Sequence, residues 1–230
     1  MTHVDSAALA RSIDQTMLKP TIGHEAGTVW IRANRGHHFA TLCVPPFLVA
    51  AAADALVAVD TAVCSVVGFP LGYAVASAKV CDAIRLVELG CRDVDMVVNI
   101  GALLEGDDDY VLGDISAVVA AVKDASGGMS LVKVILETGY LSEEDIARGC
   151  RLAEEAGAGF VKTSTGFGPR GASVRDVEIM RLEVSSNVGI KAAGGIRDLD
   201  TALALLEAGA TRLGTSAGIE ILAEATARGI

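Results

Sequence analysis

Two charged residues interrupt the apolar run Leu131-Val132-Lys133-Val134-Ile135-Leu136-Glu137. Successive side chains of an extended strand point to opposite faces, so Lys133 and Glu137 share one face and three aliphatic residues share the other. The run Val94-Asp95-Met96-Val97-Val98-Asn99 alternates in the same way, with Asp95 and Asn99 on one face. Both runs therefore predict strands that pack one face on apolar helices and carry charges on the other.

Short apolar runs alternate with segments of helical spacing along the whole chain. The expected strands are Ser12–Thr16, Phe39–Val44, Ala62–Val67, Val94–Asn99, Leu131–Glu137, Phe160–Ser164, Ile190–Ala193 and Arg212–Thr215. The expected helices are His24–Arg35, Phe47–Val57, Val75–Leu89, Asp114–Ala125, Glu143–Ala156, Val174–Val184, Leu199–Glu207 and Gly218–Ala227. Eight strand–helix units in 230 residues predict one parallel α/β domain over residues 1–230.

Two α/β architectures compete for this pattern. A doubly wound open sheet has apolar central strands and usually a G-x-G-x-x-G turn, which this chain lacks. A barrel of eight strand–helix units has polar side chains on the inward faces of its strands. The charged strand faces therefore favour a single-domain (β/α)8 TIM barrel.

Composition limits the classes of partner. Hydrophobic residues make up 51% of the chain and charged residues 21%, which excludes disorder. The formal net charge of -10 argues against nucleic acid and anionic membranes as partners. A mean hydropathy of +0.46 is high, and it predicts that apolar surface closes a homodimer interface.

The cysteines and histidines point to a reduced compartment without a metal site. The five cysteines are irregularly spaced and form no C-x-x-C, so we expect reduced core residues in a cytoplasmic protein. The histidines, His3, His24, His37 and His38, show no metal-ligand spacing, and we predict neither metal nor cofactor. Met1 to Arg11 contains no apolar segment of the signal-peptide type.

Lys133, Lys162 and Lys191 follow one another at intervals of 29 residues, each in a consecutive expected strand. One interpretation is structural: each lysine neutralises an inward carboxylate such as Asp95 or Glu137, since an unpaired buried charge is costly. Three lysines on adjacent strands are hard to satisfy with those two carboxylates alone.

The other interpretation is Schiff-base chemistry. A lysine attacks a carbonyl only after it loses its proton, and both burial and a second nearby ammonium promote that loss. Adjacent strands lie about 4.8 Å apart, which brings Lys162 near Lys191. Asp95, on an inward strand face, is the expected acid/base group beside the imine.

Glycines at the ends of three strands suggest an anion site. Gly166 follows the strand of Lys162, Gly194 and Gly195 follow that of Lys191, and Gly214 and Ser216 end the last strand. Backbone N–H groups at such turns and at a helix N-terminus bind phosphate, and barrels often place this site after strands 7 and 8. The alternative is that these glycines only form tight turns.

Six ordered motifs resemble the deoxyribose-phosphate aldolase family. They are Ile13-Asp14-Gln15-Thr16-Met17-Leu18-Lys19-Pro20, Val67-Gly68-Phe69-Pro70-Leu71-Gly72, Val94-Asp95-Met96-Val97-Val98-Asn99-Ile100-Gly101-Ala102-Leu103, Lys133-Val134-Ile135-Leu136-Glu137-Thr138, Val161-Lys162-Thr163-Ser164-Thr165-Gly166 and Lys191-Ala192-Ala193-Gly194-Gly195-Ile196-Arg197. The resemblance spans nearly the whole chain, and the run around Lys162 is its most specific part.

The resemblance implies reversible, metal-independent cleavage of 2-deoxy-D-ribose 5-phosphate to D-glyceraldehyde 3-phosphate and acetaldehyde. It implies that Lys162 forms the imine, that Lys191 assists it and that Asp95 moves protons. It also places Asp14 and Thr165 near the sugar hydroxyls. The implied phosphate contacts are Gly166, Gly194, Gly195, Gly214 and Ser216.

The chain departs from the family pattern at the expected phosphate site. Ala217 stands where many members have a second Ser, and Phe167 stands where some have a Lys. Arg170, three residues after Phe167, is a candidate to replace the missing cation, or else a solvated loop residue. The sequence also ends at Ile230 without the C-terminal Tyr that some members use in proton transfer.

Two rival functions stay open at this point. One is a phosphate-binding barrel isomerase that uses Glu137 or Asp95 as its base and forms no imine. The other is a ligand-binding relative without activity, against which the complete set of Asp95, Lys162 and Lys191 argues. We expect the Asp107-Asp108-Asp109 run to be a solvated loop and Trp30 to pack between helix and barrel.

Overall fold

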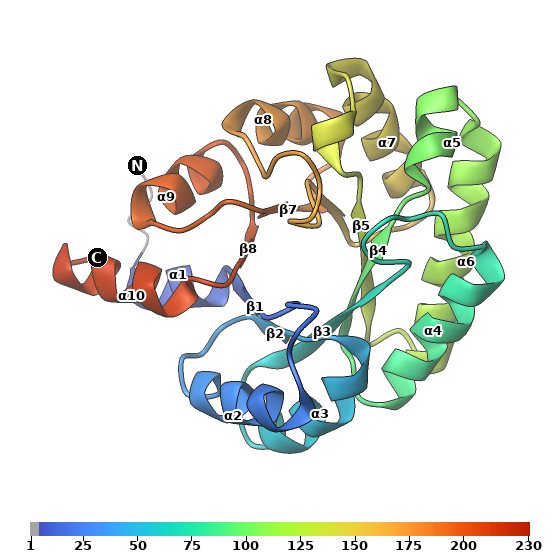
Figure 1. Ribbon diagram of the computed structural model, residues 1–230. Coiled ribbons are helices and arrows are strands. Elements are labelled where there is room, and N and C mark those ends of the chain that lie inside the picture. Colours follow the sequence, from blue (N-terminus) through green and yellow to red (C-terminus); the bar gives the residue numbers. More distant parts are fainter. Residues whose placement is uncertain (1–4) are drawn as a thin grey trace.

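Eight parallel strands form a closed barrel in the computed structural model, which describes residues 5–230 (Figure 1). The strands are β1 (Ile13–Thr16), β2 (Thr41–Cys43), β3 (Ala62–Val67), β4 (Asp93–Val97), β5 (Leu131–Ile135), β6 (Phe160–Lys162), β7 (Gly189–Ala193) and β8 (Arg212–Thr215). Each strand pairs with its neighbours in the sequence, and β8 pairs with β1. The predicted (β/α)8 barrel is confirmed. Met1 to Val4, which include His3, lie outside the described residues.

Helices surround the strands on the outside of the ring (Figure 1). The α-helices are α1 (Ser6–Arg11), α2 (His24–Asn34), α3 (Val49–Leu56), α4 (Ala76–Glu88), α5 (Ile100–Glu105), α6 (Asp108–Ser126), α7 (Glu143–Glu155), α8 (Val174–Glu183), α9 (Leu199–Glu207) and α10 (Gly218–Ala227). Two short 3-10 helices, η1 (Pro46–Leu48) and η2 (Thr138–Tyr140), follow β2 and β5. The expected helix Phe47–Val57 is therefore divided between η1 and α3.

The apolar core lies between the strands and the helices, as the alternating strand faces predict. Val94 and Met96 of β4 and Val132 and Val134 of β5 point outward into this layer and are buried there. The opposite faces of the same strands carry Asp93, Asp95 and Lys133 into the barrel, where they are also buried. The barrel interior is consequently ionic, while the layer around it is aliphatic.

Two expected strands end earlier than predicted because their last polar residues start the next element. Asn99 lies beyond β4 and caps α5, with its side chain accepting a hydrogen bond from the Ala102 N–H at 3.2 Å. Glu137 lies beyond β5 in the left-handed region, with a φ of 59°. A polar residue that continues an alternating pattern can thus belong to the turn that ends the strand.

The expectation of a solvated loop at Asp107 to Asp109 is wrong. Asp107 caps α6 by accepting a hydrogen bond from the Tyr110 N–H at 3.2 Å, and Asp108 and Asp109 occupy the first helical turn. Negative side chains are favourable at a helix N-terminus because its free N–H groups carry partial positive charge. The acidic run therefore starts a helix that begins earlier than the expected Asp114.

Other local expectations have mixed outcomes. Ser142 caps α7 and forms a capping box with Asp145. Cys43, Cys64, Cys91 and Cys150 are free and buried, but Cys81 is free and exposed on α4, so the expected core role is wrong for Cys81. Among residues 5–230, no helix is both long and apolar enough to span a membrane.

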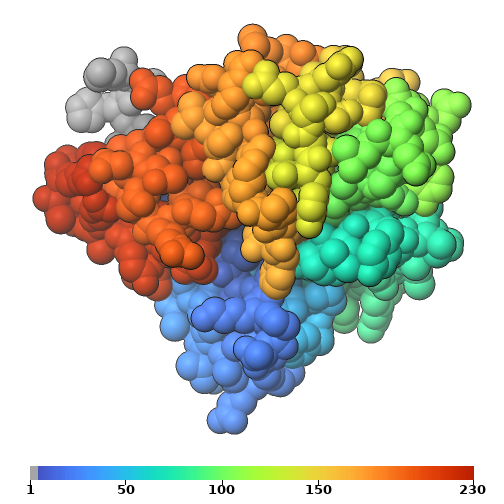
Figure 2. Space-filling model, turned by 45° about the horizontal axis from the view of Figure 1, so that its top comes forward, coloured from blue at the N-terminus to red at the C-terminus, as the bar shows by residue number. Residues whose placement is uncertain are grey.

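Loops after the strands meet across one end of the barrel. Phe167, after β6, packs its ring edge-on against Phe69, after β3, with the ring centroids 5.5 Å apart. The space-filling view shows the orange segment after β6 reaching the blue and teal segments of the first third of the chain (Figure 2). This contact narrows the mouth of the barrel at the carboxyl ends of the strands.

Candidate active site

Asp95 is the centre of the ionic barrel interior. Its Oδ2 accepts hydrogen bonds from the Nζ atoms of Lys162 and Lys191, each at 2.7 Å. Lys162 and Lys191 are direct partners in the register of β6 and β7, which confirms the predicted proximity. One carboxylate oxygen therefore bridges two ammonium groups on adjacent strands.

Lys191 is completely buried and keeps its charge. Its Nζ lies 2.6 Å from Asp14 Oδ2, in addition to the contact with Asp95. Burial alone would lower the pKa of Lys191, but the Asp14 and Asp95 carboxylates hold it well above its ordinary value. Lys191 is therefore a permanent cation beside Lys162.

Asp95 keeps the opposite charge for the same reason. Burial alone would raise the pKa of Asp95, but Lys133, Lys162 and Lys191 hold it well below its ordinary value. An ionised carboxylate that accepts hydrogen bonds from two amines can exchange protons with either of them.

Lys133 neutralises buried carboxylates, which is the structural one of the two interpretations of the strand lysines. Its Nζ lies 2.5 Å from Asp93 Oδ2 and 3.3 Å from both Asp14 Oδ2 and Asp95 Oδ1. Asp93 and Asp14, rather than Glu137, complete the set of carboxylates. Lys133 is completely buried and does not line the cavity described next.

A cavity of about 640 Å³ opens at the carboxyl ends of the strands, above the ionic cluster. Most of the predicted site residues line it, namely Lys162, Thr165, Gly166, Gly194, Gly195, Gly214 and Ser216. Trp30 of α2 also lines it and packs against the core, which combines its expected packing role with a place at the cavity. Lys162 is the only one of the three strand lysines among the described lining residues.

Asp14, Asp95 and Lys191 lie below the cavity and are completely buried. Asp14 was expected near the sugar hydroxyls, but its partners are ionic: Lys191, Lys133 and, at 2.7 Å from Oδ1, Arg212. Burial alone would raise the pKa of Asp14, but these three cations hold it well below its ordinary value. In this structure Asp14 forms an ion pair with Lys191 and does not line the cavity.

The glycine-rich end of the cavity presents free backbone donors. Within residues 5–230, the N–H groups of Gly166, Gly194 and Gly195 have no hydrogen-bond partner in the protein. Gly194 has a φ of 89°, and a Cβ on Gly171 would lie 2.1 Å from the Gly194 carbonyl oxygen, so both positions require glycine. The loops after β6 and β7 are thereby held together around a group of unpaired N–H donors.

The two cations of this end are Lys19 and Arg197, which sequence reasoning did not single out. Both line the cavity, and within residues 5–230 neither has an ion-pair partner. Both belong to the quoted motifs, so the signal was available: Lys19 is the seventh residue of the motif that begins at Ile13, and Arg197 follows Gly194-Gly195-Ile196. Arg170 is instead paired with Asp176 of α8 and donates to the Thr138 carbonyl oxygen at 3.0 Å.

Thr165 lines the cavity and pairs with Glu137, which lies behind it. The Thr165 hydroxyl donates to Glu137 Oε2 and accepts a hydrogen bond from the Phe167 N–H at 3.0 Å. Glu137 is 1% exposed and is absent from the cavity lining. It therefore shapes the loop after β6 and is badly placed to act as the base of an isomerase.

Comparison with known proteins agrees with this geometry. The family described as DeoC/LacD family aldolase matches residues 30–224. The deoxyribose-phosphate aldolase of Caldanaerobacter subterraneus subsp. tengcongensis is 47% identical over 222 residues, covering 96% of this chain and 95% of the relative. That of Enterococcus faecalis is 46% identical over 221 residues, covering 96% of this chain and 99% of the relative.

A solved structure leads to the same family. The tetrameric deoxyribose phosphate aldolase from Aeropyrum pernix superposes with a TM-score of 0.86 at 29% sequence identity. The match covers 95% of this chain and 91% of the other.

Proposed function

The chain belongs to the DeoC/LacD family of aldolases, and from this premise we propose that it cleaves 2-deoxy-D-ribose 5-phosphate to D-glyceraldehyde 3-phosphate and acetaldehyde. The proposed intermediate is a Schiff base on Lys162, and the proposed role is deoxyribonucleoside catabolism. One observation carries the assignment: Lys162 reaches the cavity while its Nζ contacts an ionised Asp95 that also binds the permanent cation Lys191.

The first half of the proposed reaction forms the imine. The ammonium of Lys162 loses a proton, which the positive charge of Lys191 favours, and the free amine attacks the aldehyde carbon C1 of the open-chain sugar. Asp95, within 2.7 Å of both amines, passes protons to the departing hydroxyl, which leaves as water.

The second half breaks the carbon–carbon bond. The protonated imine accepts the electron pair of the C2–C3 bond as a base removes the C3 hydroxyl proton. Glyceraldehyde 3-phosphate leaves, and an enamine of acetaldehyde stays on Lys162. Protonation at C2 and hydrolysis release acetaldehyde, and because the imine is the electron sink the reaction as proposed needs no metal.

The phosphate of the substrate is proposed to bind at the glycine-rich end. The N–H groups of Gly166, Gly194 and Gly195, the residues Gly214 and Ser216, and the cations Lys19 and Arg197 support this placement. A hydrogen bond to a charged oxygen contributes about 1.5–3 kcal/mol, so several such donors bind the phosphate without help from Arg170. A cytoplasmic location and a homodimer stay predictions from the sequence.

Trapping of the imine tests the proposal. Borohydride treatment in the presence of acetaldehyde is expected to add an ethyl group to Lys162, as read by peptide mass mapping. Lys162→Arg should abolish both trapping and turnover because a guanidinium stays protonated. Lys123→Arg, on the exposed surface of α6, is the matched control and should keep both. Ethylation of Lys133 with Lys162 unmodified would contradict the assignment.

A further inference from the structure

Two cysteines that the proposed reaction does not use form a cluster with the central aspartate, Asp95. Cys43 of β2 and Cys64 of β3 are direct partners in the strand register, so both side chains point into the barrel. Both are completely buried. Cys64 Sγ lies 3.3 Å from Asp95 Oδ1, and the two sulfur atoms and the carboxylate all lie within 4.8 Å of one another.

These distances are close to those of a metal site. Zinc binds thiolate sulfur at about 2.3 Å and carboxylate oxygen at about 2.0–2.2 Å with tetrahedral angles, which places sulfur atoms about 3.8 Å apart. Because the ligand atoms all lie within 4.8 Å of one another, the cluster needs to contract by about 1 Å at most to reach this geometry. We propose that Cys43, Cys64 and Asp95 bind a thiophilic divalent cation such as Zn²⁺, and that the bound ion inhibits the aldolase.

The local charge allows a cation to bind despite the neighbouring lysines. Each thiol releases one proton when it becomes a metal ligand, so a divalent ion replaces two protons and the net charge of the cluster does not change. Burial, the Cys43 thiol and Asp95 hold the pKa of Cys64 well above its ordinary value, and Lys133 Nζ, 3.7 Å from Cys64 Sγ, acts in the opposite direction. The proton of Cys64 is therefore displaced by the arriving cation and not lost beforehand. Two thiolates and one carboxylate select a soft ion over Mg²⁺ or Ca²⁺.

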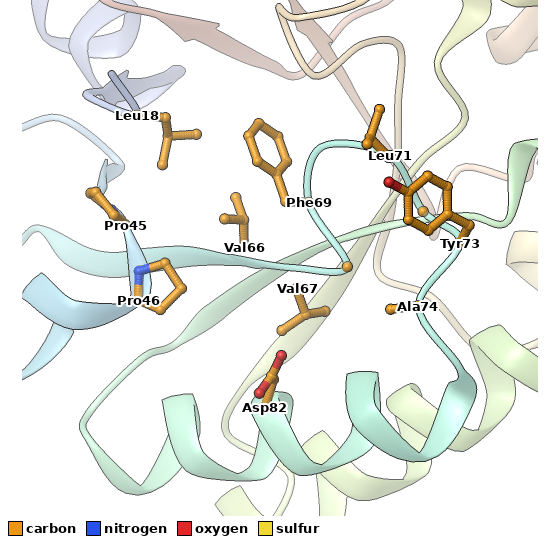
Figure 3. A pocket seen from close by; sticks show the side chains of 12 residues that line it. Leu18, Pro45, Pro46, Val66, Val67, Phe69, Leu71, Tyr73, Ala74 and Asp82 are labelled. Carbon is orange, nitrogen blue, oxygen red and sulfur yellow. The ribbon is translucent and has the colours of Figure 1, made fainter. Parts of the chain in front are cut away.

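A surface pocket leads to the cluster. Cys43 and Cys64 pack with Val66, and the partly buried side chains of Leu18 and Phe69 cover them. Leu18, Val66 and Phe69 also line a pocket of about 450 Å³ at the surface (Figure 3). The pocket therefore ends one layer of side chains above the two sulfur atoms, and rotation of Leu18 or Phe69 would admit an ion.

Inhibition follows from the way Asp95 is shared. Its Oδ1 faces Cys64 and Lys133, while its Oδ2 accepts hydrogen bonds from Lys162 and Lys191. A cation bound to Oδ1 withdraws charge from Oδ2 and weakens its capacity to accept protons from these amines. This part rests on the proposed function, whereas binding of the ion does not.

Cadmium titration of the reduced, metal-free protein under argon tests the site, because cadmium thiolates absorb in the ultraviolet. One Cd²⁺ per chain with this absorption is expected for the wild type and for Cys81→Ser, which removes the exposed thiol. Cys43→Ser and Cys64→Ser should each weaken binding by at least about 100-fold, beyond the 10–100-fold typical of outer partners of a metal. Equal binding by all four proteins would overturn the proposal.

X-ray absorption of the wild type keeps the test decisive if a cysteine variant does not fold. Two sulfur neighbours and at least one oxygen neighbour around cadmium are expected, and one sulfur neighbour or none would contradict the site.

Activity distinguishes the two parts of the proposal. Turnover of deoxyribose 5-phosphate should fall in proportion to bound metal and return with a chelator. Full turnover of the metal-loaded protein would refute inhibition. Inactivation that only a thiol reductant reverses would show that a disulfide, and not a bound metal ion, is the cause. A metal-free protein without turnover would refute the proposed function, while the absorption still reports on the site.

Discussion

Asp95 Oδ2 accepts hydrogen bonds from two ammonium groups, so a change at Lys191 acts directly on Lys162. In Lys191→Leu, Lys162 loses a neighbouring positive charge and gains a larger share of Asp95. Both effects favour its ammonium form, so the acidic limb of the pH profile of imine formation should move to higher pH. Trapping of the imine at neutral pH should therefore be slower in Lys191→Leu than in the wild type.

The conservative variant separates this charge effect from a packing effect. Lys191→Arg keeps the positive charge between Asp14 and Asp95 but changes the shape of the side chain. Its profile of imine formation, followed by borohydride trapping from pH 5 to 9, should shift less than that of Lys191→Leu. Profiles that shift equally in both variants would mean that Lys191 acts only by filling space.

Two arginines near the glycine-rich end are expected to differ in their effect on binding of the substrate phosphate. Arg197 lines the cavity without an ion-pair partner among residues 5–230, whereas Arg170 is bound to Asp176 and to the Thr138 carbonyl. Arg197→Ala should raise the KM for deoxyribose 5-phosphate by about 10- to 100-fold, since a charge-assisted hydrogen bond contributes about 1.5–3 kcal/mol. Its activity on unphosphorylated deoxyribose should stay nearly unchanged.

Arg170→Ala is the matched comparison. It should change the activity on deoxyribose 5-phosphate and on unphosphorylated deoxyribose to the same extent. A selective loss for the phosphorylated substrate in Arg170→Ala, with none in Arg197→Ala, would restore the phosphate role that the sequence suggested. The sequence suggested a phosphate role for Arg170 because it lies only three residues after Phe167. In the structure its guanidinium turns towards α8 and pairs with Asp176.

At the scale of elements, α4 and α6 are joined by a buried ion pair. Lys79 Nζ lies 2.5 Å from Asp114 Oδ2 and donates to the Val97 carbonyl oxygen at the end of β4. Both side chains are essentially inaccessible. Lys79→Met leaves Asp114 buried and unpaired, which should cost about 3–5 kcal/mol of unfolding free energy in chemical denaturation.

Two further variants show whether the unpaired charge causes this loss. Lys79→Met combined with Asp114→Leu removes both charges and should recover most of the stability, since apolar replacements of buried pairs are often neutral. Arg151→Met breaks the more exposed pair with Glu183 between α7 and α8 and should cost less than about 1 kcal/mol. A double variant as unstable as Lys79→Met would contradict the charge explanation.

Much of the strand pattern could be predicted from the sequence because its period is visible. Alternation placed Asp95 and Lys133 on inward faces, and the regular spacing of the lysines predicted that Lys162 and Lys191 would be neighbours, as the register confirms. The partners Asp14 and Asp93 could not be assigned, because periodicity gives a face but not the stagger between strands. The cysteine cluster was missed for the same reason, since Cys43 and Cys64 meet only across two strands.

At the scale of the whole molecule, the barrel closes only when β1 pairs with β8, which joins the two ends of the described chain. Loss of either strand opens the ring and exposes the ionic interior to water. If the chain is one domain, as the sequence predicts, the described barrel should unfold as a single cooperative unit. The ratio of calorimetric to van't Hoff enthalpy should then be near one, with a total of roughly 160 kcal/mol at about 0.7 kcal/mol per residue.

Trp30 allows a sharper test of cooperativity, because it is the only tryptophan of the chain and lies on α2, apart from α4 and α6. Denaturant unfolding followed by Trp30 fluorescence should coincide with unfolding followed by circular dichroism, which reports on all helices. Lys79→Met removes the ion pair between α4 and α6 and the hydrogen bond to β4, none of which involves α2, yet it should move both transitions to the same lower midpoint. If the fluorescence transition stayed in place while the circular dichroism transition moved, α2 and its neighbouring strands would unfold independently, and the barrel would consist of at least two cooperative units.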